Sequence, residues 1–148
     1  MSDLVFDSAR PADREAVFSL LREAGLTTAG IAEDLAHFFV VRILSEVAGV
    51  VGLEYYGECA LLRSLAVVPA HRGKGLGRRL AARALEAAAA HGAREVYLLT
   101  VTAPNFFERL GFATTDREDV PAPVRQSLEF REVCPASAAV LRLKGKRS

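Results

Sequence analysis

Residues 67–78 read Val67-Val68-Pro69-Ala70-His71-Arg72-Gly73-Lys74-Gly75-Leu76-Gly77-Arg78, between an apolar run and a long helical pattern. Glycine alternates with other residues here, at Gly73, Gly75 and Gly77. Because glycine lacks a Cβ, its backbone can adopt positive φ and bring several N–H groups close to a bulky anion. The first turn of the following helix adds unpaired N–H groups and the positive end of the helix dipole. We therefore expect this loop to bind a diphosphate or a similar anion.

Basic side chains cluster around these glycines, at Arg72, Lys74, Arg78 and Arg79. The cluster is local, because the whole chain has 19 Lys and Arg against 18 Asp and Glu, a formal net charge of +1. Such a balance provides no overall field for nucleic acid or an anionic membrane, so we expect neither partner. The alternative interpretation is a tight strand-to-helix connection with solvated charges, although the glycines are more than a turn needs.

Two common phosphate-binding loops do not match this spacing. A P-loop has four residues between its glycines, followed by Lys and Ser or Thr. A dinucleotide-binding loop has the pattern G-x-G-x-x-G, whereas Gly75 and Gly77 are followed by Arg78-Arg79-Leu80. Nicotinamide and flavin cofactors are therefore poor candidates.

The flanks of the loop predict a buried strand and a long helix. Residues 60–68 are almost continuously apolar, interrupted by Arg63 and Ser64, as in a strand covered on both faces. Across residues 75–91 apolar side chains recur at helical spacing, and Gly92 follows where a helix can end with positive φ. Beyond it we expect a strand at residues 96–101, a helix at 104–110 and a strand at 112–115.

The other segments read as short strands and helices of one domain, residues 1–148. We expect a strand at Leu4–Ser8, a helix at residues 13–24, a second helix at 31–37, and paired strands at 38–44 and 47–53. In the tail we expect a helix at 123–128, a strand at 138–143 and a frayed end at 144–148. With 51% hydrophobic residues, the chain can build a substantial core. This order predicts a mixed α/β (α+β) sheet with helices on both faces.

The cysteine and terminal patterns favour a reducing compartment. Cys59 and Cys134 are far apart and outside metal-ligand spacing. The amino terminus is charged and lacks the apolar core of a signal peptide, and no run is long enough to span a membrane. The three histidines lie on different predicted elements without a second ligand at metal spacing. We therefore expect a cytoplasmic protein that uses no metal.

Two motifs resemble those of the GNAT superfamily of N-acetyltransferases. The pattern Arg72-x-x-Gly75-x-Gly77 after Leu65-Ala66-Val67-x-Pro69 resembles the acetyl-CoA motif of that family. The segment Ala103-Pro104-Asn105-Phe106-Phe107-Glu108-Arg109-Leu110-Gly111-Phe112 is similar to the family's A-x-x-F-Y-x-x-x-G-F segment. The resemblance implies a mostly antiparallel central sheet of about six to seven strands and acetyl-CoA as the donor. By element order it covers residues 4–143, with close matches at 61–78 and 96–112.

The resemblance also implies how the donor is bound. The strand edge at Leu65, Ala66 and Val67 would hydrogen-bond the pantetheine arm of acetyl-CoA. The loop would hold the diphosphate through Arg72, Gly73, Lys74, Gly75, Leu76, Gly77 and Arg78. Phe107 is assigned to the same site, at the position where the family usually has the tyrosine that protonates the departing thiolate. Phenylalanine has no proton to donate, so the usual acid is missing.

A narrower resemblance links the chain to small N-acetyltransferases associated with arsenic resistance. It is carried by Leu61-Leu62-Arg63-Ser64-Leu65, Tyr97-Leu98-Leu99-Thr100, residues 106–112 and Cys134-Pro135-Ala136-Ser137-Ala138. It implies that the acceptor is an amine-bearing arsenical or another amino-acid-like compound. The chemistry of these residues does not by itself indicate arsenic.

Acetyl transfer to nitrogen requires a neutral amine, and an alkylamine with a pKa near ~10 is neutral in only about one molecule per thousand at pH 7. We predict Glu54 as the general base, because it follows the strand at residues 47–53 and would lie near the reactive end of the donor. The alternative is a solvated carboxylate at a strand end. Tyr55 and Tyr56 are candidate acids, although aromatic residues there are more often packing groups.

Arg63 and Cys134 each have two interpretations. A guanidinium inside an apolar strand needs an anion, which for Arg63 is either an acidic group of the substrate or a structural partner such as Glu54. Cys134 is either a reactive thiol or, more often for such a residue, a small buried hydrophobic side chain. We predict that Arg63 binds the substrate and assign no role to Cys134.

The sequence as a whole predicts an acetyl-CoA-dependent N-acetyltransferase that acts on a small-molecule amine. One alternative is a protein amino-terminal acetyltransferase, which would need an open groove for a peptide. The other is a non-catalytic acyl-CoA-binding sensor, because such a protein would not need the missing tyrosine. A homodimer formed through a sheet edge or the carboxyl-terminal segment is compatible with the sequence, which shows no interface for it.

Overall fold

The computed structural model describes residues 4–101, 103–132 and 138–144, and a seven-stranded sheet lies at its centre. The strands follow the spatial order β1-β2-β3-β4-β5-β7-β6. They are β1 (Leu4–Ser8), β2 (Phe38–Ile43), β3 (Glu46–Tyr56), β4 (Cys59–Val67), β5 (Glu95–Thr100), β6 (Ala113–Thr114) and β7 (Ala139–Lys144). β4 and β5 run parallel, and the other neighbouring strands are antiparallel. The expected mixed, mostly antiparallel sheet is confirmed.

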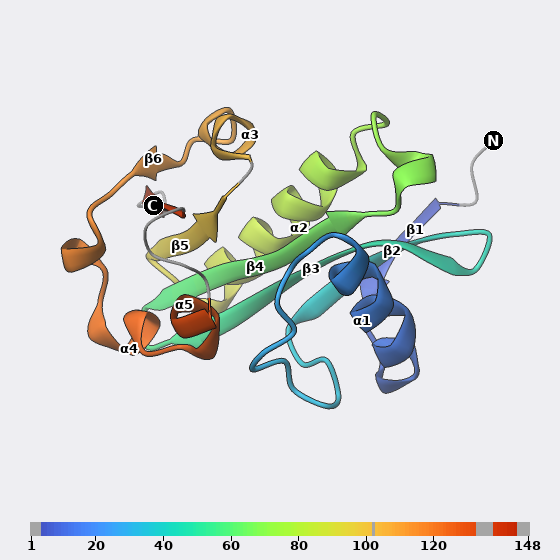
Figure 1. Ribbon diagram of the computed structural model, residues 1–148, viewed down its shortest axis with the longest axis horizontal. Helices are drawn as coiled ribbons and strands as arrows, with labels where there is room; N and C mark the ends of the chain where they lie inside the picture. Colours follow the sequence, from blue (N-terminus) through green and yellow to red (C-terminus); the bar gives the residue numbers. More distant parts are fainter. Residues whose placement is uncertain (1–3, 102, 133–137, 145–148) are drawn as a thin grey trace.

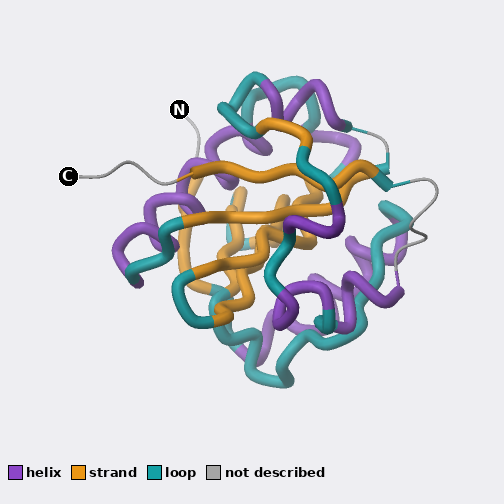
Figure 2. The backbone as a smooth tube through the Cα atoms, turned by 90° about the vertical axis from the view of Figure 1, so that its left-hand side faces the viewer, coloured by secondary structure: helices purple, strands orange, loops and turns teal. Residues whose placement is uncertain are grey.

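Helices cover both faces of this sheet (Figures 1 and 2). They are α1 (Arg14–Glu23), α2 (Leu76–His91), α3 (Pro104–Glu108), α4 (Ala122–Arg125) and α5 (Leu128–Glu132), with 3-10 turns at Pro11–Asp13, Pro69–His71 and Arg117–Asp119. α1 packs on one face and α2 on the other, while α4 and α5 lie on the same face as α1, over the start of β4 (Figure 1).

The core alternates between the two faces because successive side chains of a strand point in opposite directions. Val41 and Val51 pack against α2, whereas their neighbours Val40 and Val50 pack against α1. All four side chains are completely buried. The nearly continuous apolar runs of the central strands follow from this double coverage.

A β-bulge at Ser64 interrupts β4. Val50 of β3 pairs with Ala66, but Gly52 pairs with Arg63, so β4 has one extra residue between the two pairs. Ser64 takes up this residue with a φ of 62°. The parallel pairing of β4 with β5 covers Cys59, Ala60 and Leu61 and then ends. Beyond Leu61 the two strands separate, so from Leu62 to Val67 the β5-facing edge of β4 has no partner strand among the described residues.

The predicted helix at residues 31–37 is wrong. This segment consists of turns, in which Leu35 and His37 have φ values of 57° and 66°. The Oδ1 atom of Asp34 accepts a hydrogen bond from the N–H of Ala36 at 3.1 Å, a local bond that competes with a helix. Leu35 is nevertheless buried to 1% exposure in the core beside α1, so a tertiary contact replaces the expected helical periodicity.

Several other boundaries differ from expectation; for example, Lys144 is the last residue of β7 rather than part of a frayed end. β3 continues to Tyr56, three residues past the predicted strand end, because Tyr56 still pairs with Cys59 across a tight turn at Gly57. The predicted helix at residues 123–128 is divided between α4 and α5. The Oγ atom of Ser127 accepts a hydrogen bond from the N–H of Phe130 at 3.3 Å, as in a helix amino-terminal cap, so a new helix starts there.

The Phe38 ring lies directly over Gly52, its partner across β2 and β3, in space that a Cβ on Gly52 would occupy. We expect Gly52→Ala to lower the free energy of unfolding by about 1–3 kcal/mol through this overlap. Urea denaturation measures the change. In a Phe38→Leu background the same substitution should cost clearly less, and an equal cost in both backgrounds would contradict the explanation.

Candidate active site

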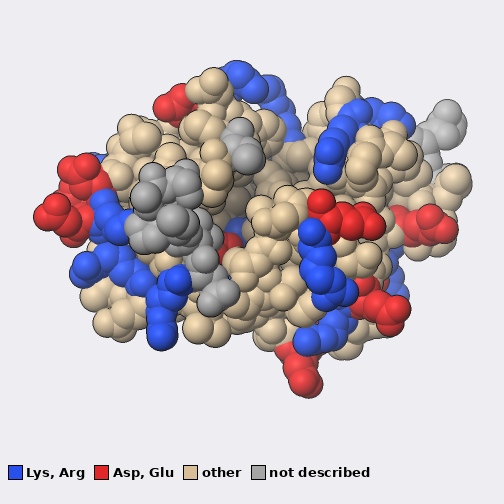
Figure 3. Space-filling view, in the orientation of Figure 1, with Lys and Arg blue, Asp and Glu red and all other residues tan. Residues whose placement is uncertain are grey.

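A cavity of about 620 Å³ opens where β4 and β5 separate. It is lined by Ala24, Gly25, Leu26, Thr27, Leu62, Arg63, Ser64, Leu65, Leu98, Leu99, Thr100, Val101, Ala103, Phe106, Phe107 and Glu129. The lining is mostly apolar, with Arg63 and Glu129 as its charged members. The corresponding face of the molecule is hollowed near the centre of Figure 3, where small areas of both charge signs are visible in the hollow.

The glycine loop joins the end of β4 to the start of α2 beside this cavity. Gly73 and Gly75 have φ values of 82° and 79°, which side chains other than glycine rarely adopt. Gly75 is the N-cap of α2, no side chain of the described residues caps this end, and the first helical bond joins the N–H of Arg79 to the carbonyl of Gly75. The N–H groups in the first turn of α2 therefore have no helical partners, which is the arrangement that an anion needs.

Gly77 of α2 lies next to Phe106, a residue that lines the cavity. A Cβ on Gly77 would lie 3.7 Å from the Cζ atom of Phe106 and 3.9 Å from Cγ2 of Val67, which are ordinary contacts. Phe106 itself lines the cavity. The protein therefore has room for a side chain at residue 77, and the glycine leaves this space open.

The structure brings most of the predicted donor-binding residues to one region. The Nε atom of Arg72 donates to the carbonyl of Val67 at 3.0 Å, and the Nζ atom of Lys74 lies 3.0 Å from Nδ1 of His71. Leu65 lines the cavity, whereas the Ala66 and Leu76 side chains are buried in the core at 7% and 4% exposure. Those two residues can therefore offer only main-chain groups to a ligand. The Arg78 side chain is exposed at the start of α2.

Phe107 is part of the apolar wall of the cavity. Its side chain is 7% exposed, and its ring lies edge-on to Phe106 and Phe112 with centroid distances of 5.0 and 5.9 Å. The space that a tyrosine ring would need is thus present, but its hydroxyl is absent. Any proton for the departing thiolate has to come from another group.

The buried guanidinium of Arg63 is bound by protein groups from three segments. Its side chain has 0% exposure. Nη1 donates to Glu54 Oε2 and to the carbonyl of Ala29, both at 2.7 Å, and Nη2 donates to the carbonyl of Thr27 at 3.1 Å. Nε donates to the neighbouring Ser64 Oγ at 2.9 Å. The structure thus shows the structural pairing with Glu54 that the sequence left open, and binding of a substrate anion by Arg63 stays a prediction.

Glu54 lies within β3 rather than at a strand end. Its Oε2 accepts the bond from Arg63, and its Oε1 accepts a hydrogen bond from the hydroxyl of Tyr56. Burial, together with this carboxylate, raises the pKa of Tyr56 well above its ordinary value, so Tyr56 keeps its proton at neutral pH. Glu54 is absent from the residues that line the cavity. Its role as general base stays a prediction, and its visible role is to hold Arg63.

Glu129 of α5 is a second acidic residue beside Arg63. Its side chain is 9% exposed, and its Oε2 atom lies 3.4 Å from Arg63 Nε. Oε1 is buried and has no hydrogen-bond partner among the described residues. Burial raises the pKa of Glu129 to about 7, against an ordinary value of 4.5, although Arg63 acts in the opposite direction. Sequence reasoning missed this residue, because a glutamate in a charged tail with weak periodicity carries no signal.

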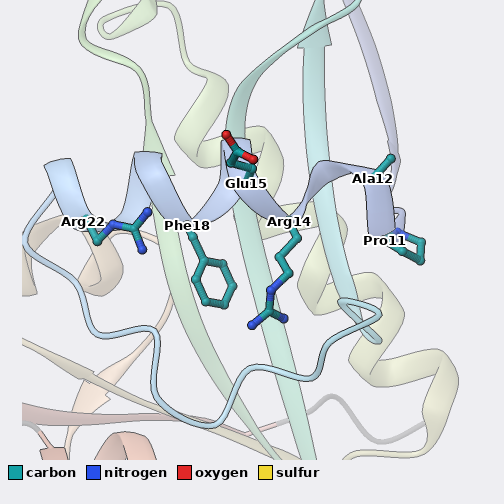
Figure 4. Close-up of a pocket in the computed structure, with 6 residues that line it drawn as sticks. All are labelled: Pro11, Ala12, Arg14, Glu15, Phe18 and Arg22. Atoms are coloured by element: carbon teal, nitrogen blue, oxygen red, sulfur yellow. The ribbon is translucent and has the colours of Figure 1, made fainter.

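A second hollow, of about 410 Å³, lies on the outer side of α1. In Figure 4 the Arg14 and Phe18 side chains project together from one side of the helix, and Glu15 projects from the other. The Arg14 guanidinium carbon lies 4.4 Å above the centre of the Phe18 ring. No residue of this hollow lines the cavity beside β4, so we place the functional site at β4.

Further observations concern metals, thiols and membranes. His37 and His91 approach each other with ring centroids 5.9 Å apart, but no group of three potential metal ligands occurs among the described residues. Cys59 is half-buried, and burial raises the pKa of its thiol. Cys134 lies outside the described residues. In the described part of the chain, no helix has the length and apolar character to cross a bilayer.

The chain belongs to the acetyltransferase (GNAT) family, whose model matches residues 3–112. It is 34% identical over 95 residues to an uncharacterized N-acetyltransferase of Chlorobaculum tepidum. That match covers 64% of this chain and 61% of the relative, so the chain spans less than two thirds of the relative's length. The predicted family is thereby confirmed, and the narrower arsenic-resistance subgroup stays a prediction.

Solved structures of acetyltransferases share this fold. The N-acetylglutamate synthase of Neisseria gonorrhoeae, complexed with coenzyme A and N-acetyl-glutamate, superposes with a TM-score of 0.84 at 20% identity, over 99% of this chain and 36% of that one. A Mycobacterium tuberculosis protein in complex with CoA superposes with a TM-score of 0.79 at 22% identity, over 96% of this chain and 99% of that one. The PaiA N-acetyltransferase of Thermoplasma acidophilum, in complex with coenzyme A, has a TM-score of 0.72 at 16% identity, over 97% of this chain and 99% of that one. At these identities the likeness shows the fold.

We expect Arg63→Met to destabilise the protein by about 3–5 kcal/mol, because it leaves the half-buried Glu54 and the buried Glu129 without their cation. The loss should be larger at pH 8 than at pH 5, where the carboxyls can take up protons instead. Chemical denaturation at the two pH values measures it. The exposed pair of Arg94 and Glu58, 3.7 Å apart, provides the control, and Arg94→Met should change stability by less than about 0.5 kcal/mol.

Glu129 should make the protein less stable as the pH rises. Because its pKa is higher in the folded chain than its ordinary 4.5, its favourable contribution is complete below about pH 4.5 and is lost as the pH rises to about 7. Between these pH values we expect wild-type stability to fall by on the order of 3 kcal/mol relative to Glu129→Gln. Denaturation curves of both proteins across this range measure the difference. Parallel pH profiles would contradict the assignment.

Proposed function

We propose that the protein transfers an acetyl group from acetyl-CoA to the amino group of a small molecule bound in the cavity between β4 and β5. The observation that carries this proposal is the separation of the two strands beyond Leu61, next to the glycine loop. An open strand edge and a set of unpaired helix N–H groups are thereby placed in sequence along one path. That path suits a ligand with an extended arm and a diphosphate.

The donor substrate would be held mainly by main-chain groups. The edge of β4 at Leu65, Ala66 and Val67 supplies N–H and C=O groups for the pantetheine arm, as an added strand would use them. The N–H groups of residues 73–78 supply donors for the diphosphate, and Arg72, Lys74 and Arg78 supply positive charge around it. When bound, acetyl-CoA provides the activated thioester.

The acceptor is proposed to be small because protein segments surround the cavity. Residues 24–27 form one side, and Glu129 of α5 contributes from the other end of the chain. The related fold of N-acetylglutamate synthase holds N-acetyl-glutamate, which supports an amino-acid-like acceptor here. An amine-bearing arsenical belongs to the same class and remains part of the proposal, on the motifs of the narrower resemblance. A cytoplasmic setting and a homodimer also remain proposals.

The proposal is tested in two steps. Titration calorimetry first measures coenzyme A binding. Thiol release from acetyl-CoA is then followed with amino acids, antibiotic amines and amino-acid-like arsenicals. Binding with amine-dependent thiol release supports the acetyltransferase. Binding without release would favour the sensor, and absence of coenzyme A binding would overturn the proposal.

We expect Gly77→Leu to weaken coenzyme A binding at least tenfold, because the new side chain would fill the space between Phe106 and Val67 that the glycine leaves open. Stability should not fall, because leucine is a better helix former than glycine. Calorimetry and thermal unfolding of the same sample measure both properties. Ala89→Leu, at an exposed position of α2, is the matched control and should bind coenzyme A like the wild type. Unchanged affinity in Gly77→Leu would contradict the proposed path.

A further inference from the structure

Glu129 is a buried acidic residue in the wall of the cavity. More than nine-tenths of its side chain is buried, and its Oε1 atom has no hydrogen-bond partner among the described residues. An ionised carboxylate in such a place is costly unless a partner supplies positive charge or a hydrogen bond. Within the part of the chain that the structure describes, this oxygen therefore has no hydrogen-bond donor, and a cationic donor would suit it best.

Among residues 4–101, 103–132 and 138–144, the positive charge in contact with this cluster is smaller than its negative charge. Arg63 is the cation that contacts two acids, and its bond to Glu54 is 2.7 Å long while its distance to Glu129 is 3.4 Å. The Nε atom nearest Glu129 donates to Ser64 Oγ instead. With both acids ionised, the three side chains carry a net negative charge. A ligand with one positive charge at Glu129 would balance it.

We propose that Glu129 binds the ammonium group of the acceptor and takes its proton before acetyl transfer. This inference rests on the proposed function and names the proton acceptor of that site. An alkylammonium ion has the charge and the N–H donors that the free carboxylate oxygen lacks. The surrounding apolar side chains of Leu26 and Leu98 suit the carbon skeleton of such a molecule.

The proposed steps balance in protons and electrons. The ammonium ion gives one proton to the Glu129 carboxylate and becomes a neutral amine. The nitrogen lone pair then forms a bond to the thioester carbonyl carbon, and the bonding pair of the C–S bond leaves with sulfur. The second proton lost by nitrogen ends on that sulfur as the coenzyme A thiol. Glu129 returns its proton to water, so one proton is released per acetyl group transferred.

The neighbouring groups favour Glu129 over Glu54 for this step. Both oxygens of Glu54 already accept bonds, one from Arg63 and one from Tyr56, and Glu54 does not line the cavity. The groups that face Glu129 are Arg63 of β4, which favours the ionised form, and Glu54 of β3, which opposes it. Their effects on the pKa of Glu129 oppose each other, so burial is the main influence. Burial keeps this pKa near the pH at which the carboxyl can both take and return a proton.

The test compares the pH dependence of wild type and Glu129→Gln, using the amine of the panel with the fastest wild-type turnover. At pH 7 we expect kcat/KM of the variant to be lower than that of the wild type by about 100-fold or more. The variant has to wait for neutral amine from solution, whose fraction rises about 100-fold between pH 7 and pH 9. The deficit should therefore shrink at least tenfold over this range. A purely structural role would produce the same deficit at every pH.

Three controls complete the experiment. Coenzyme A affinity of Glu129→Gln should equal that of the wild type, which shows that the fold and the donor site remain. Glu118→Gln, at an exposed position, should match the wild type at every pH. Glu129→Asp keeps a carboxylate and should be more active than Glu129→Gln at pH 7, which preserves the test if the glutamine variant does not fold.

The outcomes separate this inference from the proposed function. An active wild type with a pH-independent deficit in Glu129→Gln, or with Glu129→Asp no better than Glu129→Gln, would overturn the role of Glu129 and leave the acetyltransferase intact. A wild type that binds coenzyme A but acetylates no amine of the panel would overturn both.

Discussion

The site depends on the point at which the parallel pairing of β4 and β5 stops. Three residues of β4 pair with β5, and the strands then separate beyond Leu61. The extra residue at Ser64 bends β4 within this same stretch, as a bulge does. The separation exposes main-chain groups of β4, opens the cavity, and directs the end of the strand toward the glycine loop. A fully paired sheet of the same strands would offer none of these features.

A buried guanidinium holds the surroundings of this opening together. Arg63 binds the carbonyls of Thr27 and Ala29 from the segment after α1, Glu54 from β3, and lies beside Glu129 from α5. Burying one cation among several acceptors is tolerable because nearly all its N–H groups are used. The wall of the cavity is thus a polar structure inside an apolar frame. Its geometry is maintained by directional bonds rather than by packing alone.

The sequence predicted those parts of the molecule that depend on local pattern. The helix Leu76–His91, its glycine termini and the central strands follow from periodicity and from backbone freedom at Gly75 and Gly92, and the structure has them. The turns at residues 31–37, the bulge at Ser64 and the position of Glu129 could not be predicted in this way. Each arises where distant segments meet, as when Leu35 is buried beside α1, and no local spacing encodes such meetings.

The proposed donor and acceptor sites are formed by different stretches of the chain. The proposed donor site lies within residues 62–107, inside the segment that the family model matches, whereas Glu129 lies beyond its end at residue 112. The wall of the proposed acceptor site is formed by residues 24–27 and by Glu129 of α5, which are far apart in the sequence. If these assignments hold, substitutions in these stretches change which amine binds and leave the binding of coenzyme A unchanged. One fold can then serve different acceptor amines through changes confined to the stretches that form the acceptor site.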